Sequence, residues 1–319
     1  MNNDISRKIL LIGFGSIGRR HFRNLKNLGY GNVFAYDKDK KKTESLKSNA
    51  VSDITPQTLK GFSIVFICNP TSEHFSSSIL AAEAGCHLFI EKPISHTLKG
   101  ISRLQALVKK RSLITMVAAN IRFHPALQFI KRYIAEKRLG EIYKIHLEFG
   151  HFLPYWRSGM DYRKGYAMRK KTGGGILLDD IHEYDLLFWL LDFKKPVLTH
   201  IVKSKRTNLT TDTEDLASSL FLFPDNTLGT VSSDYLSQKY RRNLVILGEK
   251  GNLTWDFKED IVWRETKRGA RKIFVNRNYD VNEMYEKEIR YFLDCVSKKR
   301  KTDNDISRAA FLLKGLGIR

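Results

Sequence analysis

Cysteine is scarce in this chain of 319 residues, and long apolar runs are missing from it. The three cysteines, Cys68, Cys86 and Cys295, are widely spaced and odd in number, which argues against a disulfide framework and a clustered metal centre. No stretch reaches the roughly 18 apolar residues that a membrane span requires. Residues 1–7 are polar and run straight into a short apolar segment. We therefore expect no signal peptide, no membrane partner, no metal and a cytoplasmic location.

Acidic residues are also in deficit, with 34 against 55 lysines and arginines, which gives a formal net charge of +21. A balance this basic raises the possibility of a nucleic-acid partner. The basic residues are scattered, however, and their densest runs, 38–42 and 298–301, are short and lack any nucleic-acid-binding motif. We expect no nucleic-acid partner and favour a protein that handles anionic small molecules.

The remaining composition is that of a globular protein, with 42% hydrophobic and 28% charged residues. The length suits two domains. We place the boundary so that residues 1–119 form a nucleotide-binding domain and residues 120–319 form a substrate-binding and oligomerisation domain. No internal repeat or low-complexity segment interrupts either part.

A dinucleotide-binding fingerprint lies near the start of the chain. Residues 8–12 predict a buried strand and residues 19–28 a helix, and between them lies a glycine-rich string (Gly13, Phe14, Gly15, Ser16, Ile17 and Gly18). In this pattern Gly13 permits a tight turn, Gly15 lets a pyrophosphate approach, and Gly18 allows close helix–strand packing. The backbone N–H groups and the helix dipole would hold the phosphates.

An acidic residue follows at the expected distance. Residues 32–36 predict a second strand, which ends at Asp37, about 20 residues past the last glycine. A carboxylate there binds the adenosine ribose hydroxyls and repels a 2′-phosphate, by about 1 to 4 kcal/mol at close range. This favours NAD over NADP, although the lysines at positions 38 and 40–42 soften the preference and leave NADP possible.

Strands and helices continue to alternate up to residue 118, which predicts a parallel, doubly wound sheet. We expect strands at 62–68, 87–91 and 113–118 and helices at 75–84 and 97–110. The turn Asn69-Pro70-Thr71 with His74, and the turn Glu91-Lys92-Pro93, follow two of these strands. Because ligands bind at the carboxyl edge of such sheets, Lys92 would lie at the same edge as the glycine loop. An ordinary exposed loop lysine is the alternative.

The stretch 171–185 is the second candidate site. Gly173, Gly174 and Gly175 would let the backbone lie against a flat ligand. Residues 176–191 then predict one largely buried helix, on which Asp179, His182 and Asp185 recur at intervals of three and so share a stripe. A catalytic wall fits this pattern, and so does a core histidine that is satisfied by a neighbouring acid.

The remainder of the chain predicts a helix at 126–137, a half-buried strand at 141–149 and a long loop at 151–172. That loop supplies candidate sugar and anion contacts, namely Tyr155, Arg157, Tyr162, Arg163 and Tyr166, with Trp156 a weaker candidate. A loop packed by its own aromatics is the alternative. Expected strands follow at 197–203, 216–223, 227–233, 243–247, 252–257, 261–264 and 272–276, joined as in an antiparallel meander, with helices at 281–298 and 306–316.

These motifs in this order resemble the Gfo/Idh/MocA family of nicotinamide-dependent oxidoreductases. The resemblance also rests on Asn120-x-Arg122-Phe123-x-Pro125 and on the glycines 173–175 with Asp179 and His182. It implies an α/β protein, with an N-terminal Rossmann domain and a C-terminal α/β domain that has a large, mostly antiparallel sheet. One face of that sheet typically forms homodimers or homotetramers in the family. Fingerprint and resemblance together assign to the cofactor Gly13, Phe14, Gly15, Ser16, Ile17, Gly18, Asp37, Asn69, Pro70, Thr71, His74, Glu91, Lys92 and Arg122.

Segments 153–166 and 178–183 look like members found in bacterial surface-polysaccharide and sugar-nucleotide pathways. We therefore predict hydride transfer between NAD and a hydroxyl-bearing carbon of a sugar, sugar acid or sugar-nucleotide. His182 would be the general base and also contact the substrate, Lys92 would stabilise the alkoxide, and Asp179 would orient the imidazole or pair with Lys92. Better-studied members place the acid four residues before the histidine rather than three, which leaves the detailed role of Asp179 open, and Asp185 could share it. A redox-neutral enzyme with retained NAD and a non-catalytic NAD(P) sensor are the competing functions.

Overall fold

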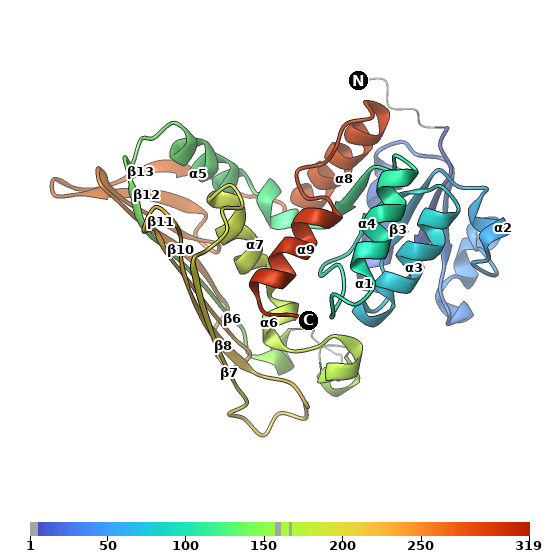
Figure 1. Cartoon of the computed structure of the whole chain (residues 1–319), viewed down its shortest axis with the longest axis horizontal. Coiled ribbons are helices and arrows are strands. Elements are labelled where there is room, and N and C mark those ends of the chain that lie inside the picture. Colours follow the sequence, from blue (N-terminus) through green and yellow to red (C-terminus); the bar gives the residue numbers. More distant parts are fainter. Residues whose placement is uncertain (1–5, 157–160, 166–167) are drawn as a thin grey trace. The chain divides into compact units, whose positions relative to one another are not determined.

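The computed structural model describes residues 6–156, 161–165 and 168–319. Contacts divide them into two compact units (Figure 1). The first unit contains residues up to 120 together with 281–314 and 318–319, and the second contains 121–280 with 315–317. Our expected second domain, 120–319, differs from this division. Residues 302–304 return to the first unit, where the Val117 N–H donates to Asn304 O at 2.8 Å and Thr302 Oγ1 donates to Thr115 O at 2.6 Å.

The first unit is built on a five-stranded sheet of order β2-β1-β3-β4-β5, in which every pair is parallel. Every residue of β1 and β3 is buried, as expected for strands covered on both faces. The strands are β1 (Ile9–Ile12), β2 (Val33–Tyr36), β3 (Ile64–Ile67), β4 (His87–Ile90) and β5 (Thr115–Val117). This confirms the predicted doubly wound parallel sheet.

Helices of the first unit pack in pairs, α1 with α8 and α3 with α4. Helix α3 begins four residues before the expected position 75, directly after Pro70, whose φ of −57° leads into the first turn. The helices of this unit are α1 (Ser16–Asn27), α2 (Pro56–Leu59), α3 (Thr71–Glu83), α4 (Ile101–Lys110), α8 (Asn282–Ser297) and α9 (Ile306–Gly315).

The second unit holds an eight-stranded sheet of order β13-β12-β11-β10-β6-β9-β8-β7. Its pairs are antiparallel except β6 with β9, which run parallel, so the predicted mostly antiparallel sheet is confirmed. The expected meander is interrupted because β6, far earlier in the chain, inserts between β9 and β10. The strands are β6 (Ile142–Gly150), β7 (Leu198–Ser204), β8 (Leu216–Leu222), β9 (Leu228–Asp234), β10 (Arg241–Gly248), β11 (Gly251–Asp256), β12 (Ile261–Thr266) and β13 (Gly269–Val275).

The helices of the second unit are α5 (Pro125–Ala135), α6 (Ile176–Asp179) and α7 (Ile181–Leu190). The single helix expected over 176–191 is wrong. Asp180 has φ −98° and ψ 37°, which interrupts the helix and separates α6 from α7. Helix α7 packs on β6 and β9, and its apolar character all round agrees with the predicted burial.

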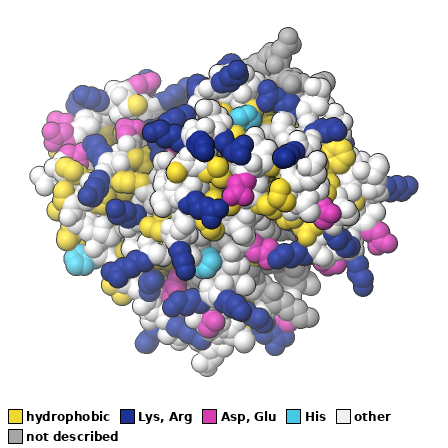
Figure 2. All heavy atoms as spheres, turned by 45° about the vertical axis from the view of Figure 1, so that its right-hand side comes forward, with side chains coloured by type: hydrophobic (Ala, Val, Ile, Leu, Met, Phe, Trp, Pro, Cys, Tyr) yellow, Lys and Arg dark blue, Asp and Glu magenta, His cyan; other side chains and the backbone are white. Residues whose placement is uncertain are grey.

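The surface carries basic side chains in dispersed positions. On the face drawn in Figure 2, the lysines and arginines are interspersed with polar, apolar and acidic side chains. Within the described ranges, we find no helix with both the length and the apolar character needed to cross a membrane.

Candidate active site

The glycine loop joins β1 to α1 and is shaped by close backbone approaches. Gly13 has φ +100°, and a Cβ on it would lie 2.4 Å from the backbone nitrogen of Asn69, so only glycine fits. A Cβ on Gly18 would lie 2.1 Å from Gly13 O. Gly15 is different, because a Cβ there would meet no heavy atom of the described chain within 4 Å. The open side of the loop therefore lies at Gly15, the N-cap of α1.

The start of α1 is suited to an anion. No side chain caps this end of the helix, and its first turn carries no acidic residue. Ser16 is exposed and Ile17 is half-buried there. The N–H groups of the first turn and the helix dipole thus present partial positive charge beside the open face at Gly15.

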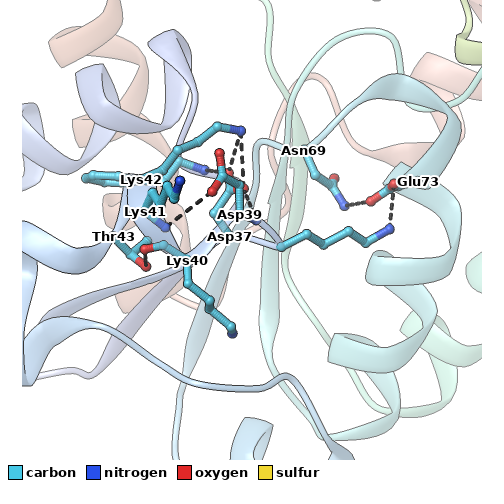
Figure 3. A network of polar contacts seen from close by, with 10 residues as sticks. Asp37, Asp39, Lys40, Lys41, Lys42, Thr43, Asn69 and Glu73 are labelled. Carbon is cyan, nitrogen blue, oxygen red and sulfur yellow. Dashed lines mark hydrogen bonds and ion pairs between the residues drawn. The ribbon is translucent and has the colours of Figure 1, made fainter.

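Asp37, at the end of β2, lies beside the same loop (Figure 3). Its Oδ2 accepts from the Phe14 N–H at 2.8 Å, its Oδ1 accepts from the Asp39 N–H at 2.9 Å, and Lys42 Nζ lies 3.2 Å from Oδ1. Burial alone would raise the pKa of Asp37, but the hydrogen bonds from Phe14, Asp39 and Lys42 outweigh it and hold that pKa below its usual value. The carboxylate is therefore charged, and it anchors the glycine loop.

A cavity of about 350 Å³ opens at this point, lined by the ends of β1, β2 and β3 and by α3. Gly13, Asp37, Lys42, Asn69 and Pro70 are among its walls. It lies where the strand order reverses between β1 and β3, the position at which doubly wound sheets bind nucleotides. An open glycine, an uncapped helix start and an acid beside a cavity together fit the adenosine and phosphate portions of NAD.

The turn after β3 is held by a buried histidine. His74 Nδ1 lies 2.8 Å from Pro93 O and its Nε2 lies 2.9 Å from Asn69 O, so the ring ties the turns after β3 and β4 together. Burial lowers the pKa of His74. Thr71 is buried in the first turn of α3. We expected His74 among the cofactor contacts, and its ring nitrogens instead face these two carbonyls.

The turn after β4 carries Lys92 next to Glu91, which is paired with a histidine. Glu91 Oε1 lies 2.6 Å from Nε2 of the buried His21 on α1, and Glu91 Oε2 accepts from the Lys92 N–H at 3.3 Å. Burial would raise the pKa of Glu91, but the hydrogen bond and charge of His21 lower it below its usual value. Lys92 is half-buried and precedes a cis peptide bond to Pro93.

His182 and Asp179 belong to the second unit, whereas Lys92 belongs to the first. The structure describes all ten residues of α7, and nine of them are buried. The tenth, His182, is half-buried. Asp179 lies on the preceding helix α6, is 7% exposed and accepts from the Tyr235 hydroxyl at 3.2 Å. The expected stripe of three residues on one helix is therefore wrong, because the break at Asp180 separates Asp179 from the other two.

Asp185 is engaged elsewhere. Its Oδ2 accepts from Arg122 Nε at 2.6 Å, and its Oδ1 accepts from the same guanidinium, which makes a bidentate pair. Arg122 is 2% exposed, and its guanidinium also lies 5.0 Å from the centre of the Phe193 ring. We expected Arg122 at the cofactor, but its side chain is bound within the second unit by Asp185.

The glycines before α6 have a structural use. Gly175 has φ +108°, and a Cβ on it would lie 2.5 Å from Oε1 of Glu214. That Oε1 also accepts from the Leu177 N–H at 3.3 Å. We expected glycines 173–175 to lie against a flat ligand. At Gly175 the space that a Cβ would take is instead occupied by the side chain of Glu214.

Sequence reasoning missed a buried ionic cluster around the break in the helix. Arg242 on β10 contacts both Asp180 and Glu183, the residues two before and one after His182. The two carboxylates are 1% and 0% exposed and the guanidinium side chain 12%. The available signal was the presence of acids such as Asp180 and Glu183 in a run that is otherwise mostly apolar, because buried carboxylates require a partner.

The loop 151–172 is partly held by its own side chains. The Trp156 ring stacks on His151 and meets Tyr235 edge-on, at centroid distances of 5.9 and 5.2 Å. Arg163 forms a two-pronged pair with Asp161, whose Oδ1 lies 2.8 Å from Nε. Tyr155 is 62% exposed, and the Tyr162 hydroxyl accepts from the Thr210 N–H at 3.4 Å. The other two predicted substrate residues, Arg157 and Tyr166, lie outside the described residues.

Comparisons with known proteins agree with this architecture. Residues 7–119 match the family model described as "Oxidoreductase family, NAD-binding Rossmann fold", and residues 127–254 match the "GFO/IDH/MocA C-terminal domain". Levoglucosan dehydrogenase from Pseudarthrobacter phenanthrenivorans is 32% identical over 130 residues, which are 40% of this chain and 33% of that protein. The matches to the first three curated relatives span 52%, 33% and 36% of those proteins.

Solved structures show the same fold. A levoglucosan dehydrogenase in complex with NADH has a TM-score of 0.85 and 18% identity, with 98% of this chain and 96% of that chain covered. UDP-N-acetylglucosamine 3-dehydrogenase from Acidithiobacillus ferrooxidans has a TM-score of 0.79 and 20% identity, with 98% and 97% covered.

The fold and the family models together define a protein with an NAD-binding Rossmann unit of the oxidoreductase family and a C-terminal domain of the same family. The chain belongs to the Gfo/Idh/MocA family. The predicted family and the predicted NAD-binding domain are therefore confirmed.

Proposed function

We propose that this chain is an NAD-dependent dehydrogenase that oxidises or forms a CH–OH group in a sugar, sugar acid or sugar-nucleotide. We also propose that it acts in the cytoplasmic synthesis of surface-polysaccharide sugars, a role suggested by segments 153–166 and 178–183. Several relatives carry sugar or cyclitol dehydrogenase names, including those for levoglucosan, scyllo-inositol and UDP-N-acetylglucosamine. These names support the substrate class, and the exact sugar is a matter for the experiment below.

The position of His182 is the observation that carries the proposal. His182 is half-buried, whereas the other nine residues of α7 are buried. An imidazole whose unperturbed pKa is near neutrality can take a hydroxyl proton and return it. In this proposal Asp179, whose carboxylate is held by Tyr235, orients the His182 ring or pairs with Lys92.

Lys92 has the complementary role. Its ammonium would stabilise the negative charge that develops on the substrate oxygen as His182 removes the proton. The contact between His21 and Glu91 and the hydrogen bond from the Lys92 N–H to Glu91 support the turn that carries Lys92. Bound NAD supplies the hydride acceptor, and the glycine loop, Asp37 and the turn at Asn69 would hold its adenosine and phosphate groups.

The test uses the purified protein with NAD or NADP and a panel of sugars, sugar acids and sugar-nucleotides, followed by the absorbance of reduced nicotinamide. His182→Ala should lower turnover about 10²- to 10⁴-fold. Gln57→Ala, which removes an exposed side chain on α2 of the first unit, is the control and should leave turnover unchanged.

Three other outcomes would change the proposal. Normal turnover in His182→Ala would remove this residue from the role of base. Sugars that change mass or configuration without net reduction of NAD would indicate a redox-neutral enzyme. Tight NAD binding with no change in any sugar would favour a sensor.

We also propose that the eight-stranded sheet forms a homodimer or homotetramer through its open face. Three large apolar side chains on the edge strands of that face are exposed, namely Leu198 at 42%, Val202 at 69% and Val275 at 43%. A single exposed apolar side chain is common, but three on one face of a sheet favour an interface. Light scattering of the purified chain should give twice or four times the 36.9 kDa of one copy, and a monomeric mass would contradict this proposal.

A further inference from the structure

We propose that Arg242 is a positioning residue for His182, acting through the two carboxylates that flank it, Asp180 and Glu183. The inference rests on the proposed function, because it gives His182 a reaction to perform. It concerns residues of the second unit only, and all of them are described.

The guanidinium of Arg242 reaches from β10 to both sides of His182. Its NH2 atom lies 3.3 Å from Asp180 Oδ1, and its Nε lies 2.6 Å from Glu183 Oε1. NH2 is also 3.5 Å from Glu183 Oε2. One planar group therefore contacts the residue at the α6–α7 break and the residue that follows His182.

The guanidinium is itself held in place by its surroundings. It lies 4.8 Å from the centre of the Phe149 ring and 5.8 Å from that of Phe257. The second oxygen of Asp180 accepts from the Ser233 hydroxyl on β9 at 2.6 Å. Asp180 therefore joins the helix break to two strands, β9 and β10. The position of these strands fixes the geometry of the break.

The charges make these contacts interdependent. Two buried carboxylates face one guanidinium, and burial together with the nearby Glu183 raises the pKa of Asp180 well above its usual value. Arg242 then balances mainly Glu183, and its removal would leave a buried carboxylate beside His182 without a cation. The break would relax to solvate that charge, and the imidazole would move with it.

Other anchors of α7 lie away from His182 and provide a comparison. The Tyr184 hydroxyl meets Ser219 Oγ at 3.0 Å, and Lys131 Nζ donates to Trp189 O at 2.7 Å near the end of the helix. If the Arg242 cluster served stability alone, loss of Arg242 and loss of Lys131 would affect turnover in the same way once the folded fraction is accounted for.

The first experiment measures kcat, sugar KM and NAD affinity in Arg242→Met combined with Asp180→Asn and Glu183→Gln. The triple variant removes the three charges of this cluster and leaves no unpaired carboxylate, which favours a retained fold. It also removes the guanidinium that spans positions 180 and 183 and fixes the geometry of the break. We therefore expect kcat per folded molecule to fall at least tenfold, because small misplacements of a catalytic group are costly. Sugar KM and NAD affinity should change less than threefold.

Two further variants sharpen the result. Arg242→Lys, as a single substitution, keeps the positive charge but lacks the fork that spans both carboxylates. Its thermal stability should therefore stay close to that of the wild type, whereas its kcat should fall. Lys131→Met should leave kcat per folded molecule within threefold of the wild type. A folded triple variant with kcat within threefold of the wild type would overturn the inference.

A second readout needs no substrate and so separates this inference from the proposed function. Diethyl pyrocarbonate modifies accessible imidazoles, and mass spectrometry of peptides reports the rate at His182 alone. A loosened helix break should make His182 react at least threefold faster in the triple variant than in the wild type, with Lys131→Met unchanged. Equal rates at His182 would overturn the positioning role, even for a wild-type protein that converts no sugar in the panel.

Discussion

Replacing Lys42 with alanine should increase the preference of the protein for NAD over NADP. Lys42 Nζ lies 3.2 Å and 3.5 Å from the two oxygens of Asp37, the acid that would repel a 2′-phosphate (Figure 3). Two other nearby lysines, Lys38 and Lys40, are engaged elsewhere. Lys38 Nζ is 2.7 Å from Glu73 Oε1, and Lys40 Nζ lies 4.4 Å from the centre of the Tyr36 ring.

The ion-pair separation of 3.2 Å between Lys42 and Asp37 gives an upper bound on the effect, because a 2′-phosphate beside Asp37 would lie no nearer to Lys42 than such a contact. Two unit charges at that distance interact by about 1 kcal/mol in water and about 5 kcal/mol at an effective dielectric constant of 20. The Lys42 side chain is 41% exposed, so solvent screens the pair and the lower part of this range applies. A loss of about 1–2 kcal/mol corresponds to NADP binding that is about 5- to 30-fold weaker.

The assay is titration calorimetry of NAD and NADP with the wild type, Lys42→Ala and the matched control Lys38→Ala. NAD affinity should change less than threefold in both variants, because NAD has no 2′-phosphate. An NADP-to-NAD affinity ratio that stays within twofold of the wild type in Lys42→Ala would refute the reasoning. A larger loss in Lys38→Ala than in Lys42→Ala would refute it as well.

Three further predictions concern stability and reactivity. Burial raises the pKa of Cys86 to about 11, so this buried thiol stays protonated near pH 8, and Ellman's reagent should label it only after denaturant is added. Gly175→Ala should destabilise the protein by about 1–3 kcal/mol in thermal unfolding, because φ is +108° and Glu214 occupies the space of a Cβ; an unchanged melting temperature would contradict this. Arg122→Met should cost about 3–5 kcal/mol by leaving Asp185 buried without its partner, and adding Asp185→Asn should recover part of the loss in denaturant unfolding.

The nucleotide-binding half of the fold could be predicted because its signals are local. The apolar runs of β1 and β3 and the glycines between β1 and α1 are contiguous in the chain. Each determines a strand or a turn without help from distant residues. The parallel sheet and the fingerprint loop therefore follow directly from the sequence.

The second site was harder to predict because its geometry depends on distant partners. Intervals of three placed Asp179, His182 and Asp185 on one stripe, but this assumed a continuous helix. The break at Asp180 is sustained by Arg242, about 60 residues further along the chain, and by Ser233. Asp185 is likewise bound by Arg122, about 60 residues earlier in the chain. No periodicity within residues 171–185 carries that information.

The return of residues 281–314 to the first unit has a consequence for how the protein is made. The edge strand β5 is covered by residues 302–304, which leave the ribosome after residues 121–280 of the second unit. The nucleotide-binding unit therefore stays unfinished while the eight-stranded sheet is already complete enough to fold. A nascent chain stalled near residue 280 should carry a folded second unit beside an open β5 edge, and it is at this stage that chaperones have the most exposed backbone to protect.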